Sequence, residues 1–179
     1  GDRRIARLLL EALRRGGHEV HLAARLRSRD PTGDRLRQAR MADLGQRLAA
    51  RLLHRYAKAD AGPDAWLTYH LYYKAPDWIG PHVAAALGIP YIAIEASHAP
   101  KRAGGPWALS HRAVEHAIRQ AAHVICLNPN DRACLEPLAT GRTSLLAPFL
   151  DPAPYAPDPG ARAALAARHG LPADMPWLL

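Results

Sequence analysis

The stretch Gly-Gly-His-Glu-Val at residues 16–20 follows directly on an amphipathic helical pattern, and this junction limits the possible folds more than any other feature. Apolar residues recur with helical spacing over residues 2–15, and the two glycines end the helix. A strand is expected to start at Val20 and to include Leu22 and Ala24. A helix that leads into a strand normally follows a parallel strand. The chain is therefore expected to start inside a βαβ unit whose first strand is missing.

Helical and extended patterns then alternate along the chain. Helices are expected at residues 34–59, 77–87, 107–121 and 129–138, and strands at residues 64–70, 89–94, 123–127 and 143–147. This alternation predicts an α/β domain, with a Rossmann-like parallel sheet and helices on both faces.

A proline-rich stretch at residues 148–159 ends the alternation and is typical of a linker. We expect an N-terminal domain at residues 1–150 and a linker at residues 151–172, with a short helix at residues 161–169. Residues 173–179 are expected to contribute the first strand of a second domain.

The composition bounds the class of protein. The chain has 179 residues, 49% of them hydrophobic, and carries a net charge of +8 with a pI of about 10.1. Arginine supplies most of the positive charge, which fits either an anionic partner or the arginine usage of a GC-rich genome. No run of ~18 apolar residues predicts a membrane span. Cys126 and Cys134 form no CxxC pair, which favours a reduced, cytoplasmic location.

Candidate binding residues lie where the expected strands end, because ligands of open parallel sheets bind at the carboxyl ends of the strands. The strand ends supply Arg25, His70, Glu95 and Asn128, and the start of the first helix supplies Gly1 and Asp2. Backbone N–H groups at such a helix start suit anions or sugar hydroxyls.

The richest stretch contains Glu95, His98, Lys101 and Arg102, followed by two glycines. An imidazole exchanges protons near neutral pH, and the basic pair suits phosphate or carboxylate. The alternative is that His98 only caps the strand and that the basic pair is solvated. His70 has a similar alternative, because packing beside neighbouring tyrosines also explains a histidine there.

Several motifs are absent. The histidines show no His-x-x-x-His spacing, so no metal site is expected. The sequence has no intact GxGxxG, no P-loop and no Gly-x-Ser-x-Gly elbow, which argues against an acyl-transfer serine.

The helix expected at residues 34–59 is amphipathic. Its basic ridge consists of Arg40, Arg47, Arg51, Arg55 and Lys58. The apolar face is expected to pack in the core, and the ridge is expected either to be solvated or to contact anionic lipid head groups.

Taken together, the chain resembles the N-terminal domain of a family 4 glycosyltransferase with the GT-B fold. The resemblance covers nearly the whole chain and depends on the order of short motifs: Gly-Gly-His-Glu-Val (16–20), Thr-Tyr-His (68–70), Leu-Gly-Ile-Pro-Tyr (87–91), Glu-Ala-Ser-His (95–98) and Ala-His-Val-Ile-Cys-Leu-Asn (122–128). The Ala-Pro-Phe-Leu-Asp segment (147–151) is similar to the crossing into the inter-domain linker.

The resemblance implies that this domain holds the acceptor, which would be a glycan, a lipid-linked molecule or a small molecule. A C-terminal domain would bind a UDP- or GDP-sugar, and transfer would be retaining, with no metal or other cofactor. His98 matches a histidine that contacts the donor sugar, and His70 matches a histidine common after the preceding strand. The segment at residues 100–106 matches no general family signature and is expected to serve acceptor binding. This chain alone is expected to be inactive.

Two other functions remain open. The charge is compatible with a non-enzymatic α/β module that binds an anionic partner, but the basic face lacks the interleaved aromatics of single-strand binders, so nucleic acid is not expected. A sugar epimerase of the same GT-B architecture is the second alternative. The expected location is cytoplasmic, with peripheral membrane contact through the basic ridge.

Overall fold

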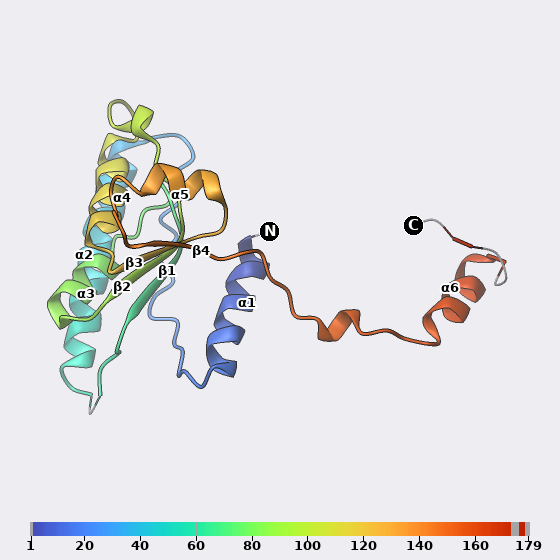
Figure 1. The fold of residues 1–179 in the computed structure, drawn as a ribbon. Helices are drawn as coiled ribbons and strands as arrows, with labels where there is room; N and C mark the ends of the chain where they lie inside the picture. Colours follow the sequence, from blue (N-terminus) through green and yellow to red (C-terminus); the bar gives the residue numbers. More distant parts are fainter. Residues whose placement is uncertain (1, 60, 173–175, 178–179) are drawn as a thin grey trace. The chain divides into compact units, whose positions relative to one another are not determined.

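The first unit of the structure, a computed structural model, is built on a four-stranded parallel sheet flanked by helices, which confirms the predicted α/β class (Figure 1). The structure describes residues 2–59, 61–172 and 176–177. The strands are β1 (Trp66–Leu71), β2 (Tyr91–Ala96), β3 (His123–Cys126) and β4 (Thr143–Leu145), in spatial order β1-β2-β3-β4. The connections between them contain α3 (Gly80–Leu87), α4 (Ala108–Gln120) and α5 (Pro129–Leu135).

The remaining elements of the first unit are α1 (Asp2–Arg15), α2 (Arg35–Tyr56) and the 3₁₀ helix η1 (Pro100–Arg102). Asp34 caps α2, because its carboxylate accepts hydrogen bonds from the backbone N–H groups of Leu36 and Arg37. No helix within the described ranges is both long and apolar enough to cross a membrane.

The strand predicted at residues 20–24 is wrong. Residues 18–30 have no regular secondary structure, and Leu22 is 66% exposed. Ala23, Ala24 and Leu26 do pack against buried side chains of α2 and α3. The apolar alternation therefore reflects side-chain packing. A strand also needs a neighbouring backbone to pair with, and β1 is an edge strand of the described sheet, with no ladder to this segment.

Two clusters of buried side chains form the core. The larger joins β1, β2 and β3 to α3, α4 and α5, and it includes Leu71, Ile118 and Leu135. The smaller joins α2 to α3 through Leu52 and Val83. Full burial of one such aliphatic side chain contributes about 1.5–3 kcal/mol, so these contacts hold the helices on the sheet.

Helix α2 is amphipathic, as predicted. Leu52 is buried, and Leu48, Leu53 and Tyr56 pack against the smaller cluster. Every residue of the basic ridge is exposed. The ridge is thus available to solvent while the opposite face stays in the core.

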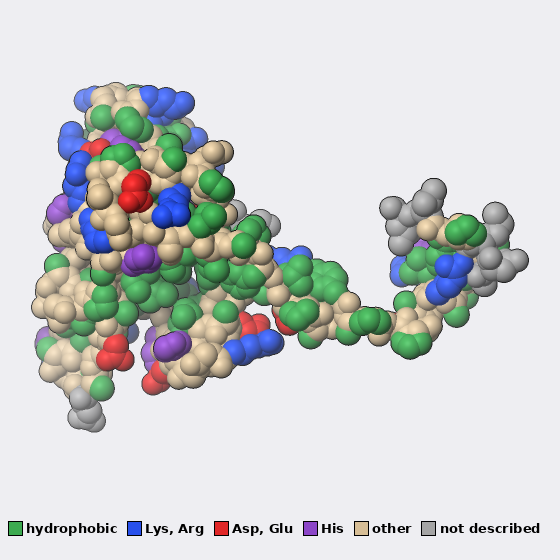
Figure 2. All heavy atoms as spheres, in the orientation of Figure 1, with side chains coloured by type: hydrophobic (Ala, Val, Ile, Leu, Met, Phe, Trp, Pro, Cys, Tyr) green, Lys and Arg blue, Asp and Glu red, His purple; other side chains and the backbone are tan. Residues whose placement is uncertain are grey.

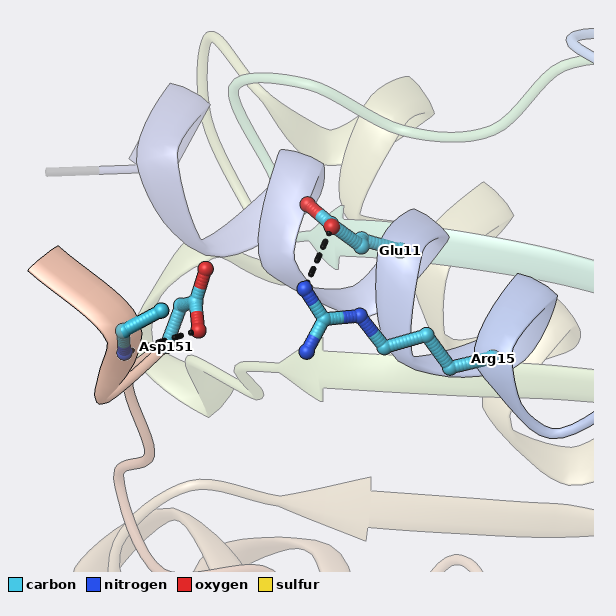
Figure 3. Close-up of polar contacts among 4 residues, drawn as sticks. Glu11, Arg15 and Asp151 are labelled. Atoms are coloured by element: carbon cyan, nitrogen blue, oxygen red, sulfur yellow. Dashed lines mark hydrogen bonds and ion pairs between the residues drawn. The ribbon is translucent and has the colours of Figure 1, made fainter.

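Helix α1 has the predicted extent, but none of its apolar side chains belongs to either core cluster. Ile5, Leu8, Leu9 and Leu13 are only partly buried. An i,i+4 ion pair lies on its exposed side, where Arg15 Nη2 is 2.9 Å from Glu11 Oε1 (Figure 3).

The second compact unit starts at Phe149. It contains the 3₁₀ helix η2 (Ala153–Tyr155) and α6 (Ala161–His169), the latter with the predicted bounds. Asp151 Oδ1 accepts a hydrogen bond from the backbone N–H of Ala153 at the start of η2 (Figure 3). The strand predicted within residues 173–179 lies largely outside the described residues, and Pro176 and Trp177 show no strand.

Candidate functional site at the ends of β1 and β2

Two residues with left-handed backbone stand side by side where β1 and β2 end. His70 has a φ of 64° and Glu95 a φ of 57°, and they are the positive-φ non-glycine residues among those described. The parallel register pairs Tyr69 with Ile94 and Leu71 with Ala96, so His70 and Glu95 occupy the position between these pairs on both strands. Such backbone costs about 1–3 kcal/mol per residue and concentrates at functional sites.

A row of aromatic rings continues from His70. The ring centroids of His70 and Tyr72 are 4.8 Å apart, those of Tyr72 and Tyr73 are 5.9 Å apart, and those of Tyr73 and Trp107 are 5.5 Å apart. The row brings the connection after β1 against the residue that precedes α4.

Two cations lie over the end of this row. The guanidinium carbon of Arg102 is 5.3 Å from the ring centroid of Tyr73 and 5.0 Å from that of Trp107. The ammonium of Lys74 is 5.8 Å and 5.7 Å from the same two centroids. We call Tyr72, Tyr73, Lys74, Arg102 and Trp107 the aromatic–cation cluster. Its cation–π contacts order two long basic side chains that would otherwise be mobile.

A buried polar network holds this cluster in place. Gln38 on α2 donates through Nε2 to Asp30 Oδ2 at 2.8 Å and to the carbonyl of Pro106 at 2.9 Å, and its Oε1 accepts from the backbone N–H of Ser110. The indole N–H of Trp107 donates to the carbonyl of Asp30, whose own N–H donates to the carbonyl of Lys74. The network therefore fixes the backbone on both sides of the aromatic–cation cluster.

Asp30 is ionised in this network. Burial raises the pKa of its carboxyl group, but hydrogen bonds from Gln38, Thr32 and Gly33 together outweigh burial and hold the pKa below its ordinary value. Both oxygens are used, because Oδ1 accepts from Thr32 and Gly33 while Oδ2 accepts from Gln38.

His98 follows β2, and its side chain contacts Glu115 and His111 on α4. Its Nε2 is 2.9 Å from Glu115 Oε1, and its ring centroid is 5.3 Å from that of His111. His111 is 1% exposed. Burial lowers the pKa of His111, which the Glu115 carboxylate partly opposes, so a neutral imidazole is favoured there.

The other predicted residues are spread more widely. Arg25 is exposed in the segment without regular structure, and Lys101 is exposed on η1. Asn128 is the N-cap of α5, where its Oδ1 accepts from the backbone N–H of Asp131. Gly1 and the side chain of Asp2 lie outside the described part of the chain. The structure thus brings together His70, Glu95 and, through the aromatic row, Arg102.

Positive charge gathers near this site. Figure 2 shows Lys and Arg side chains at the upper end of the first unit, where the connection between β2 and α4 lies in Figure 1. This connection carries Lys101 and Arg102. The surface here suits an anionic group of a ligand.

Two surface pockets of the described structure lie away from the aromatic–cation cluster. One of about 550 Å³ is lined by side chains of α1 alone. The other, of about 240 Å³, lies beside α3 and the first residue of β2. Neither includes a residue of the aromatic–cation cluster.

Sequence reasoning selected His70, Glu95, His98 and Arg102 but missed the role of Tyr73 and Trp107. These two are far apart in the chain, and no local pattern predicts their contact. It also missed Glu115, although the spacing His111-x-x-x-Glu115 places the two side chains on one face of a helix.

Comparison of the sequence with protein-family models gives no match, and comparison with curated proteins gives no significant match.

Proposed function

We propose that this chain is the acceptor-side domain of a nucleotide-sugar-dependent glycosyltransferase of the GT-B type. The observation that carries the proposal is the pair of left-handed residues, His70 and Glu95, at adjoining strand ends beside a row of aromatic rings. Ligand sites combine apolar and aromatic walls with a few fixed polar groups. A sugar offers both partners, because its C–H faces stack on rings and its hydroxyls bond to carboxylate, imidazole and guanidinium groups.

In this proposal each polar residue has a separate task. His98 contacts the donor sugar, while His70 and Glu95 bind hydroxyls of the acceptor. Arg102, already ordered by two aromatic rings, offers charge to an anionic group of either substrate. The donor is a UDP- or GDP-sugar, bound mainly by a C-terminal domain, and transfer retains the anomeric configuration without a metal.

The test is a thermal-shift screen of the complete gene product with UDP, GDP, ADP and their sugar conjugates. A ligand at a hundred times its Kd stabilises the native state by about 2.7 kcal/mol, so a true donor should raise the Tm measurably. Selective stabilisation by one nucleotide supports the proposal. No shift with any of them contradicts it and favours a binding module without transferase activity.

Replacement of His98 by alanine is expected to lower turnover of the complete enzyme about 100-fold or more, because a contact made to the reacting sugar is lost. The measurement is kcat with the donor found above, with circular dichroism to show that the fold is kept. His82→Ala, an exposed histidine on α3, is the matched control. An unchanged rate in the His98 variant would leave that residue a structural role only.

The basic ridge of α2 supports a second part of the proposal, contact with an anionic membrane surface. The double variant Arg47→Glu, Arg51→Glu is expected to weaken binding to phosphatidylserine vesicles at least about tenfold, since each basic residue near the surface contributes about 1 kcal/mol. Vesicle co-sedimentation at low and high salt measures this effect. The control Arg112→Glu, Arg119→Glu on α4 makes the same change in net charge. Equal weakening in both variants, or parent binding that salt does not reduce, contradicts membrane contact by the ridge.

A further inference from the structure

Three side chains that can ligate a metal lie close together between the segment after β2 and α4. His98 follows β2, whereas His111 and Glu115 are four residues apart on α4. One ligand atom from each lies within 4.8 Å of the others. His98 Nε2 is 2.9 Å from Glu115 Oε1, and His111 Nδ1 is 3.9 Å from Glu115 Oε2.

The His111 ring is buried with weak polar contacts. It is 1% exposed, its Nδ1 is 3.9 Å from Glu115 Oε2, and the backbone of Ala99 also acts on it. An imidazole buried without well-formed hydrogen bonds is destabilising, and a metal bond to one nitrogen would remove part of that cost.

The chemical types of the three ligand atoms favour one class of metal ion. Two imidazoles and one carboxylate are a common ligand set of Zn²⁺, whereas Ca²⁺ and Mg²⁺ prefer oxygen ligands. With bonds of about 2.0–2.1 Å in a tetrahedral site, neighbouring ligand atoms lie roughly 3.3 Å apart. The 2.9 Å and 3.9 Å separations involve different oxygens of Glu115, and the three ligand atoms lie within 4.8 Å of one another, so the side chains would rotate to reach this spacing.

We propose that His98, His111 and Glu115 bind one Zn²⁺ ion. Water would take the fourth position on the side of Glu115, whose side chain is 30% exposed. The ion would tie the connection after β2 to α4 and so fix the segment that carries Lys101 and Arg102. This role is structural and does not depend on the transferase proposal. A zinc bond would use the Nε2 atom of His98 and leave its Nδ1 atom for a hydrogen bond to the sugar.

The experiment measures zinc binding by the 179-residue chain alone, without nucleotide or sugar, so that its result is separate from any test of transfer. The metal-free chain is titrated with Zn²⁺ by isothermal calorimetry, and Co²⁺ absorption in the visible region reports the coordination geometry. The variants are His98→Gln and Glu115→Gln, both at partly exposed side chains, and their folding is checked by circular dichroism. His116→Gln is the control, because this exposed histidine adjoins Glu115 on the same helix.

The expected result is one tight site per chain, with the absorption of four-coordinate Co²⁺. Loss of an outer-shell partner of a metal ligand costs about 10–100-fold in affinity, so loss of a direct ligand in His98→Gln or Glu115→Gln should cost at least about 100-fold. The His116→Gln affinity should equal that of the parent. The proposal is overturned if the parent binds no stoichiometric zinc or if the two ligand variants bind it as tightly as the control. The His98–Glu115 contact is then only a direct hydrogen bond.

Discussion

Replacement of Gln38 by leucine is expected to destabilise the first unit by about 3–5 kcal/mol. Gln38 is 1% exposed, and its amide bonds to Asp30, Pro106 and Ser110. Leucine preserves most of the volume but leaves a carboxylate oxygen, a carbonyl and an N–H without this partner. Each buried polar group left unpaired costs about 1–3 kcal/mol, and a charged group costs more.

The ionisation of the Asp30 carboxylate decides at which pH this measurement shows the full effect. Its pKa is lowered on folding, so its contribution is fully present above the ordinary value of 3.8 and is lost as the pH falls below that value. Urea unfolding at pH 7 therefore measures the whole effect. We expect the midpoint to fall sharply in Gln38→Leu.

The matched control for this prediction is Gln46→Leu, because Gln46 is exposed on the same helix. It should change the free energy of unfolding by less than about 0.5 kcal/mol. Equal stability of the Gln38 and Gln46 variants would show that the buried network contributes little.

Replacement of Gly45 by valine is expected to destabilise the chain by at least about 3 kcal/mol. Gly45 is buried on α2, and an added Cβ would lie 2.7 Å from the Trp78 carbonyl oxygen and closer still to the Trp78 Cβ. Trp78 precedes α3, so the clash would push α2 away from α3 and open the smaller core cluster. Overpacking of this kind typically costs about 1–3 kcal/mol, and a rigid backbone neighbour raises the cost.

Two further variants separate the clash from helix propensity. Alanine is favoured over glycine within a helix by about 1 kcal/mol, so Gly45→Ala would stabilise the chain if space were available. We expect it to destabilise the chain instead. Gly104→Val is the control, because nothing lies within 4 Å of a Cβ added there. The Tm of each variant measures the effect, and a stabilised Gly45→Ala would disprove close packing of α2 on Trp78.

Local patterns were enough to predict most of the elements of the first unit. Helix α1 and β3 were predicted almost to the residue, and α2 within three residues at its C-terminal end, because apolar periodicity and glycine or proline boundaries act within one segment. The same patterns failed at residues 18–30. Apolar alternation reports which side chains are buried, whereas a strand requires a backbone partner elsewhere in the chain.

For the candidate site, the sequence by itself determined which polar side chains stand at the strand ends. His70, Glu95 and His98 follow β-rich runs, and the parallel topology places such residues at one edge of the sheet. Tertiary structure alone decided the rest. The left-handed backbone of His70 and Glu95, the edge-to-face contact of Tyr73 with Trp107 and the contact of His98 with Glu115 all depend on packing between segments distant in the chain. Local residue patterns carry no record of such contacts, because they form only when the sheet and its helices pack together.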